Sequence, residues 1–107
     1  MSSQLYALEK MSAAVRSLAV GPEPLPQRLE YAFLAFHTLS PKDFPDKLAS
    51  RFAEIHDALT REKAVGNEGR VRATLAKMDK STAQDIAIAI LGLEFDLREH
   101  LDRGQRR

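Results

Sequence analysis

The chain has 107 residues, of which 44% are hydrophobic and 29% charged, with a net charge of +1 and no cysteine. This length predicts one domain, residues 1–107, that can bury a core without metal or disulfide support. The small net charge excludes a strong whole-molecule field that would attract nucleic acid or anionic membrane. The absence of cysteine excludes disulfides, thiolate metal sites and cysteine nucleophiles.

The beginning of the chain carries no sign of a targeting segment. Residues 1–10 lack the basic and apolar regions of a signal peptide. The longest apolar runs are also shorter than the ~20 residues that a membrane helix needs. We therefore expect a cytoplasmic protein that does not cross a membrane.

The first three segments have apolar residues every three or four positions, the spacing of an amphipathic helix. Gly21 and Pro22 end the first segment, and Pro26 is a favourable first residue for the second. The expected buried stripes are Leu8, Met11, Val15 and Leu18 in the first, Leu29, Ala32, Phe33, Phe36 and Leu39 in the second, and Leu48, Phe52, Ile55 and Leu59 in the third.

The last two segments are joined by the short stretch MDKS, and the fourth has Val71, Leu75 and Met78 on one side. Ser81 followed by Gln84 resembles a capping box and predicts where the last helix begins. The isoleucines in this segment alternate as they would in a strand. The cap signal, the length of the segment and the lack of a second candidate strand favour a helix.

These patterns predict an all-α fold, a compact antiparallel bundle of four to five helices with short loops. We expect residues 103–107 to form a basic, disordered tail. The expected helices cover residues 4–20, 26–39, 44–62, 68–78 and 82–102.

The last helix has two apolar arcs instead of one. Ile88, Leu91 and Phe95 lie about 140° away from the main stripe, at about 100° per residue. Gln84, Arg98 and Glu99 border this second arc, and Gly92 near its edge would let another helix approach closely. The main stripe, which we expect in the core, consists of Ala83, Ile86, Ile90, Leu93, Leu97 and Leu101.

The second arc has two interpretations that the sequence leaves open. Either other helices of the same chain cover it, or it is exposed and binds a second molecule. In the latter case Tyr31 and Leu34, on the far side of the second segment, would extend the surface, and a two-fold dimer would make it self-complementary.

Candidate catalytic and metal-binding groups are scattered. His37, His56 and His100 lie in three different segments, without the spacing that places two ligands on one helix face. Glu94 is the one carboxylate within the apolar stretch, and Arg98 one turn later predicts a surface ion pair. We expect no catalytic residue, metal or cofactor, and an enzyme is our third interpretation.

Nucleic-acid binding is the second interpretation. The basic segment 70–80 and the C-terminal tail would supply contacts to phosphates, and the last two segments resemble a helix-turn-helix. However, the early turns of the last helix offer few polar groups to base edges. Our first interpretation is therefore a small non-enzymatic protein that acts through protein–protein association, as a homodimer. The candidate nucleic-acid contacts are Arg70, Arg72, Lys77 and Lys80.

Overall fold

The computed structural model describes residues 3–64 and 66–105 and confirms the expected all-α bundle. Within these residues the chain forms five α-helices and one short 3-10 helix. Their bounds are α1 Ser3–Val20, α2 Leu25–Phe36, η1 Pro41–Asp43, α3 Asp46–Leu59, α4 Gly66–Lys77 and α5 Lys80–Gln105.

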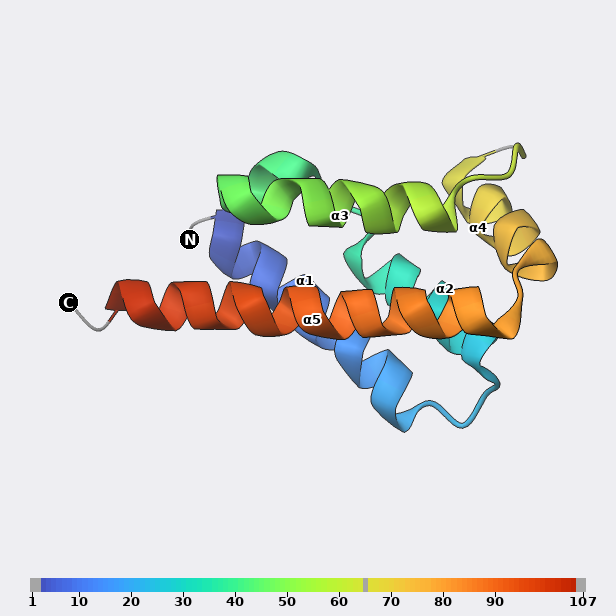
Figure 1. Cartoon of the computed structure of the whole chain (residues 1–107), viewed down its shortest axis with the longest axis horizontal. Coiled ribbons are helices and arrows are strands. Elements are labelled where there is room, and N and C mark those ends of the chain that lie inside the picture. Colours follow the sequence, from blue (N-terminus) through green and yellow to red (C-terminus); the bar gives the residue numbers. More distant parts are fainter. Residues whose placement is uncertain (1–2, 65, 106–107) are drawn as a thin grey trace.

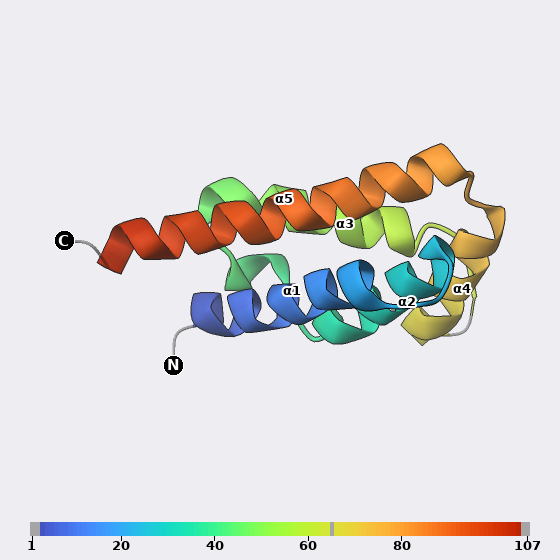
Figure 2. The same ribbon diagram turned by 90° about the horizontal axis from the view of Figure 1, so that it is seen from below.

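The helices are arranged in two layers. In Figure 1, α5 and α3 run along the front of the molecule, and α4 closes one end. Figure 2 shows the same bundle from below, with α5 and α3 in one layer and α1 and α2 in the other. α5 has 26 residues and is the longest helix, and its C-terminal turns project beyond α1 and α3 (Figure 1).

α1 packs against α2 and α5, and two of its four buried side chains are small. Ala7 and Ala14 of α1 are completely buried, together with Met11 and the nearly buried Leu18. The predicted stripe is therefore only partly correct, because Leu8 and Val15 are partly buried at its border. Helix separation depends on the side chains at the contact, so alanines can occupy the centre that larger residues would hold apart.

The core between α2 and α3 is aromatic. The ring of Phe52 lies 4.7 Å from that of Phe44 and 5.5 Å from that of Phe36, measured between centroids. Phe36 in turn makes an edge contact with Phe33 at 5.7 Å. All four side chains are buried, which confirms the stripes predicted for α2 and α3 and adds Phe44.

The ends of α2 and α3 differ from the predicted ones. α2 ends at Phe36, and the chain then turns into η1, a 3-10 helix that the apolar pattern did not reveal. Ser40 and Asp43 form a capping box across this turn, and the Ser40 N–H donates to Asp43 Oδ2 at 2.9 Å. α3 begins at Asp46 because Pro45 holds an extended conformation before it.

α5 begins two residues earlier than predicted because Asp79 caps it. The Thr82 N–H donates to Asp79 Oδ1 at 2.8 Å, and the Ala83 N–H donates to the Asp79 carbonyl at 3.1 Å. The predicted capping box of Ser81 and Gln84 is therefore wrong. Aspartate is as favourable a cap as serine, and the connection between α4 and α5 consists only of Met78 and Asp79.

The Asp79 cap gives the bundle a pH-dependent contribution to stability. Hydrogen bonds from the Thr82 side chain and then from its backbone N–H hold the pKa of Asp79 below its ordinary value of 3.8. A carboxyl group with a lowered folded pKa stabilises the fold above its unfolded pKa. That contribution is lost as the pH falls from 3.8 through the lower folded value.

We expect Asp79→Ala to lower the melting temperature at neutral pH, and this difference from the unaltered chain to vanish well below pH 3.8. Thermal unfolding followed by circular dichroism at several pH values measures both effects. Asp79→Asn is the matched control, since asparagine caps helices about as well as aspartate but does not titrate. A difference between Asp79→Ala and the unaltered chain that persists unchanged into acid would contradict this account.

The C-terminal end of α5 reaches further than predicted. Residues 103–105, expected in a disordered tail, form the last turn of the helix, and residues 106–107 lie outside the described part. In the part of the chain that the structure describes, no helix combines the length and apolar character needed to cross a membrane.

Candidate functional site

The outer surface of α5 carries three large apolar side chains that the bundle leaves in solvent. Ile88 is 65% exposed, Leu91 44% and Phe95 58%. Their spacing of three and four residues places them side by side on one face of the helix. We call these three residues the α5 patch. These three side chains are not among the buried core residues of the chain.

The opposite surface of α5 confirms the predicted core stripe. Its members pack against α1, α2 and α3, and the last of them is only partly buried. α5 is therefore buried along one side and apolar in the middle of the other. The core members are Ala83, Ile86, Ile90, Leu93 and Leu97, with Leu101 partly buried beside them.

Polar side chains surround the α5 patch. The predicted border residues Gln84, Arg98 and Glu99 are exposed around it, and Asp102 is exposed one turn further on. Asp85 lies toward α3, where it lines a small cleft together with Arg51. An apolar centre with a polar border is the usual organisation of a protein–protein contact surface.

Gly92 serves the contact between α3 and α5 more directly than it serves the patch. A Cβ atom at this position would lie 3.3 Å from the guanidinium of Arg51. The same guanidinium pairs with Asp96 at 2.6 Å and ties α3 to α5. The sequence predicted that Gly92 would let another helix approach closely, and α3 of the same chain is such a helix.

Glu94 is nearly buried, whereas we predicted an ion pair of Glu94 and Arg98 at the surface. Its side chain is only 9% exposed and pairs with Arg98 one turn later. It also accepts a hydrogen bond from the Ser12 hydroxyl of α1 at 2.9 Å. The ion pair is present as expected, but the carboxylate lies at the contact of α1 and α5, which only the folded chain brings together.

Tyr31 and Leu34 belong to a different surface. Both are exposed on the side of α2 that faces away from its buried residues. α2 lies in the layer opposite α5 (Figure 2). Because each helix buries the side that faces the core between the layers, the exposed sides of α2 and α5 face away from each other. The structure therefore does not bring Tyr31 and Leu34 together with the three residues of α5.

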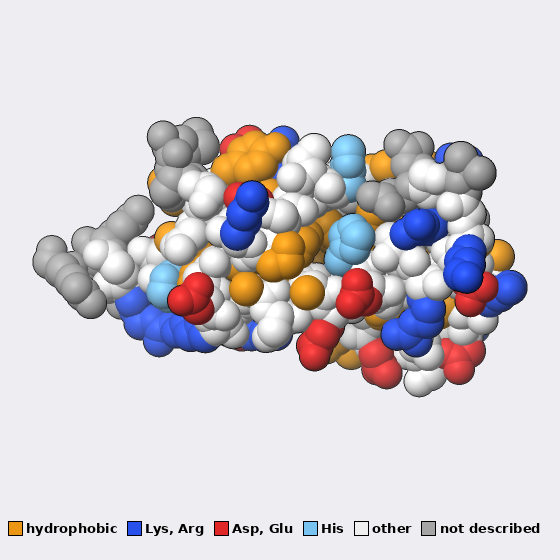
Figure 3. Space-filling view, turned by 90° about the horizontal axis from the view of Figure 1, so that it is seen from above, with side chains coloured by type: hydrophobic (Ala, Val, Ile, Leu, Met, Phe, Trp, Pro, Cys, Tyr) orange, Lys and Arg blue, Asp and Glu red, His pale blue; other side chains and the backbone are white. Residues whose placement is uncertain are grey.

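The predicted basic residues gather at the α4 end of the molecule, where Figure 3 shows Lys and Arg side chains clustered. Two of them have acidic partners. Arg72 Nε donates to Glu30 at 2.8 Å, and Lys77 donates to Glu62 at 2.9 Å.

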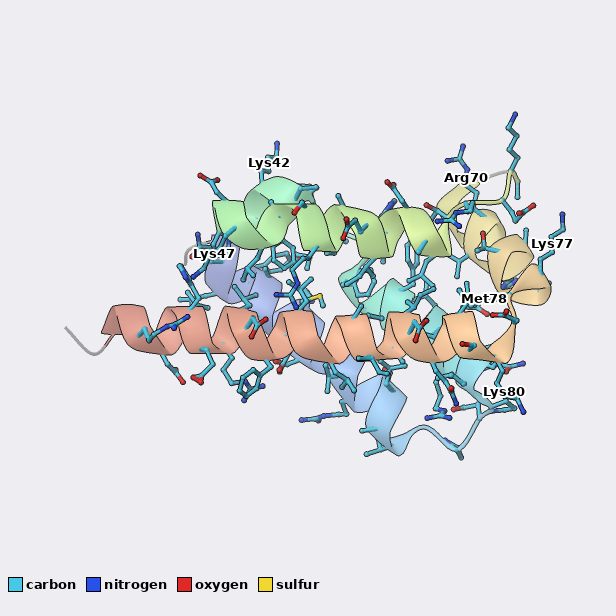
Figure 4. The ribbon with its side chains drawn as sticks, in the orientation of Figure 1. Lys42, Lys47, Arg70, Lys77, Met78 and Lys80 are labelled. Atoms are coloured by element: carbon cyan, nitrogen blue, oxygen red, sulfur yellow. The ribbon has the colours of Figure 1, made fainter. Side chains whose placement is uncertain are left out.

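The labelled basic side chains do not converge on one groove. Figure 4 shows that Arg70, Lys77 and Lys80 point toward different sides of the α4 end. The ion pairs of Arg72 and Lys77 also reduce the charge that this end presents to a phosphate backbone. Arg106 and Arg107 of the predicted basic tail lie outside the described residues.

Two of the three histidines pack against aromatic rings, and the third, His100, is partly buried near the end of α5. His56 and His37 lie against Phe33, with ring centroids 5.6 and 6.4 Å from its own. His56 also contacts Phe52 at 6.3 Å. Among the described residues no group of three or more histidine or acidic side chains is placed to hold a metal ion.

A surface cleft with a volume of about 470 Å³ lies between the start of α2 and the turn from α4 to α5. Leu25, Met78 and Ala83 contribute apolar surface. Two of its three charged groups have structural roles: Arg28 donates to the Leu18 carbonyl at 2.7 Å, and Asp79 caps α5, while Lys80 is exposed at the start of α5. This cleft offers no pair of groups arranged as a nucleophile and base.

Three features of these surfaces escaped the sequence analysis: the bond from Ser12 to Glu94, the pair of Arg51 and Asp96, and the packing of two histidines on Phe33. The two polar contacts and the packing of His56 on Phe33 join different helices, so no local pattern predicts them, whereas His37 lies four residues after Phe33 at the end of α2. No protein-family model, curated protein or solved structure matches this chain.

Proposed function

We propose that this chain acts by associating with a second copy of itself, with the α5 patch at the centre of the contact. The observation that supports the proposal is the exposure of Ile88, Leu91 and Phe95, side by side on the longest helix. Exposed apolar residues that occur singly are ordinary, whereas a contiguous group with a polar border marks an interaction surface.

The other exposed apolar side chains form weaker candidates. Leu5 and Val20 lie near opposite ends of α1, too far apart along the helix to form one surface. Tyr31 and Leu34 form a pair on α2, without a third large apolar neighbour among the exposed residues described for that helix. The α5 patch therefore has the largest continuous apolar contribution.

A second copy is the partner we propose, because one patch can supply both halves of the contact. A two-fold axis through the patch brings the same three side chains of both copies together, so one surface supplies both halves of the contact. The middle of a long, regular helix is also an unobstructed surface, since α5 lies on the outside of its layer (Figure 2).

The expected affinity is modest. Complete burial of such a side chain contributes ~1.5–3 kcal/mol, and these are already about half buried, so each adds roughly 1 kcal/mol. The six side chains of a dimer then contribute about 6 kcal/mol, which is comparable with the cost of association. We therefore propose a dimer whose population depends on concentration, with the polar border completing the contact.

Sedimentation equilibrium over a range of concentrations tests the proposal. We expect the mass to rise from 12.0 kDa toward twice that value as the concentration increases. A mass that stays at 12.0 kDa up to about 1 mM, where even an interaction of ~4 kcal/mol would show, contradicts self-association.

A further inference from the structure

We infer that the two α5 helices of the proposed dimer pack antiparallel, with their crossing point beside Leu91. This inference rests on the proposed self-association and adds the relative direction of the partners. It follows from the charges that flank the α5 patch, from the position of the patch along the helix and from the projection of the C-terminal turns.

The carboxylates that follow the patch favour antiparallel helices. Glu99 and Asp102 are exposed on the same side of α5 as Phe95. In a parallel pair, each would face its own copy across the two-fold axis, and facing like charges are unfavourable. An antiparallel pair removes both of these repulsions.

In an antiparallel pair, the side chains opposite Glu99 and Asp102 are polar or basic. Gln84 precedes Ile88 by four residues, as Glu99 follows Phe95 by four, so the two stand opposite each other in an antiparallel pair. Asp102 follows Phe95 by seven residues, and Ser81 precedes Ile88 by seven, so these two also stand opposite each other, with Lys80 beside Ser81. Asp85 lies at the α3 side of this surface, next to Arg51 in the small cleft, and not at its centre.

The helix dipole also favours the antiparallel direction. Asp102 lies in the last turn of α5, where the dipole of its own helix disfavours negative charge. In an antiparallel pair it comes opposite Ser81, in the first turn of the partner's α5, where the dipole favours negative charge.

The position of the patch along α5 also favours antiparallel helices, because it lets them overlap over most of their length. Eight residues of α5 precede Ile88 and ten follow Phe95, so the patch lies close to the middle of the helix. Antiparallel helices that cross at the patch therefore overlap over nearly all of their ~39 Å. The C-terminal turns that project beyond α1 and α3 would each lie along the first turns of the partner's α5 (Figure 1).

Single cysteines test the direction, because the chain contains none of its own. Two variants, Gln84→Cys and Glu99→Cys, place a thiol before and after the patch at exposed positions. Each is oxidised alone and in an equal mixture of the two, after its dimer has been verified by sedimentation. Gln27→Cys, at an exposed position of α2 in the opposite layer, is the control for random collision.

We expect a disulfide between the two different variants in the mixture, and little product when either variant is oxidised alone. Efficient product from each variant alone, with little mixed product, would show parallel helices and overturn the inference while leaving self-association in place. A dimer that forms no disulfide above the level of Gln27→Cys would place the contact away from α5. A chain that remains monomeric would instead contradict the proposed function.

Discussion

Phe95→Asp is expected to leave the chain monomeric at concentrations where the unaltered chain forms a dimer. The substitution removes apolar surface from both copies and places a carboxylate of each in a contact that excludes water, where an unpaired charge is strongly disfavoured. The loss of about 3 kcal/mol or more corresponds to a dissociation constant at least roughly a hundredfold higher. Sedimentation equilibrium measures the change directly.

Tyr31→Asp provides the matched control for this prediction. It introduces the same charge in place of an exposed aromatic residue, but on α2 in the opposite layer. We expect it to leave the dimer intact. If Tyr31→Asp gave monomer and Phe95→Asp did not, the contact would lie on α2. Both variants should unfold at nearly the same temperature as the unaltered chain when studied as monomers.

Phe52→Ala is expected to cause the largest loss of stability. The Phe52 side chain is 1% exposed and joins the rings of Phe36, Phe44 and His56, which come from α2, the end of η1 and α3. Truncating a buried phenylalanine costs about 3–5 kcal/mol, which is a large part of the ~5–15 kcal/mol that stabilises a domain. Urea denaturation at a concentration where the chain is monomeric measures this loss.

Phe95→Ala makes the same chemical change at an exposed position. Since Phe95 is 58% exposed and makes no contact that the aromatic core depends on, we expect a loss below about 1 kcal/mol in the monomer. Equal losses for Phe52→Ala and Phe95→Ala would mean that α5 does not present Phe95 to solvent as described.

Apolar spacing predicted the bundle because each helix buries one stripe, and a stripe is a local property of the sequence. All the residues expected in the cores of α2 and α3 are buried, as are five of the six expected in α5. The prediction was weakest in α1, because size alone made Leu8 and Val15 more convincing core residues than Ala7 and Ala14.

The candidate site was only half predictable. The sequence identified Ile88, Leu91 and Phe95 as an arc separate from the core, but it could not say whether another helix covers that arc. The answer depends on how α2 and α3 pack around α5, which involves residues far apart in the chain. For the same reason the sequence could not place Tyr31 and Leu34 in the opposite layer.

The contact of Ser12 with Glu94 and Arg98 has a consequence for how many ways the helices can fit together. Apolar surfaces of α1 and α5 alone would tolerate a slide of one helical turn, since leucine, alanine and valine accept one another as neighbours. Such a slide would leave the nearly buried Glu94 carboxylate without the hydrogen bond from the Ser12 hydroxyl and is therefore disfavoured. Ser12, Glu94 and Arg98 therefore favour one alignment of α1 on α5. Their main effect is on the specificity of helix packing and not on the free energy of unfolding.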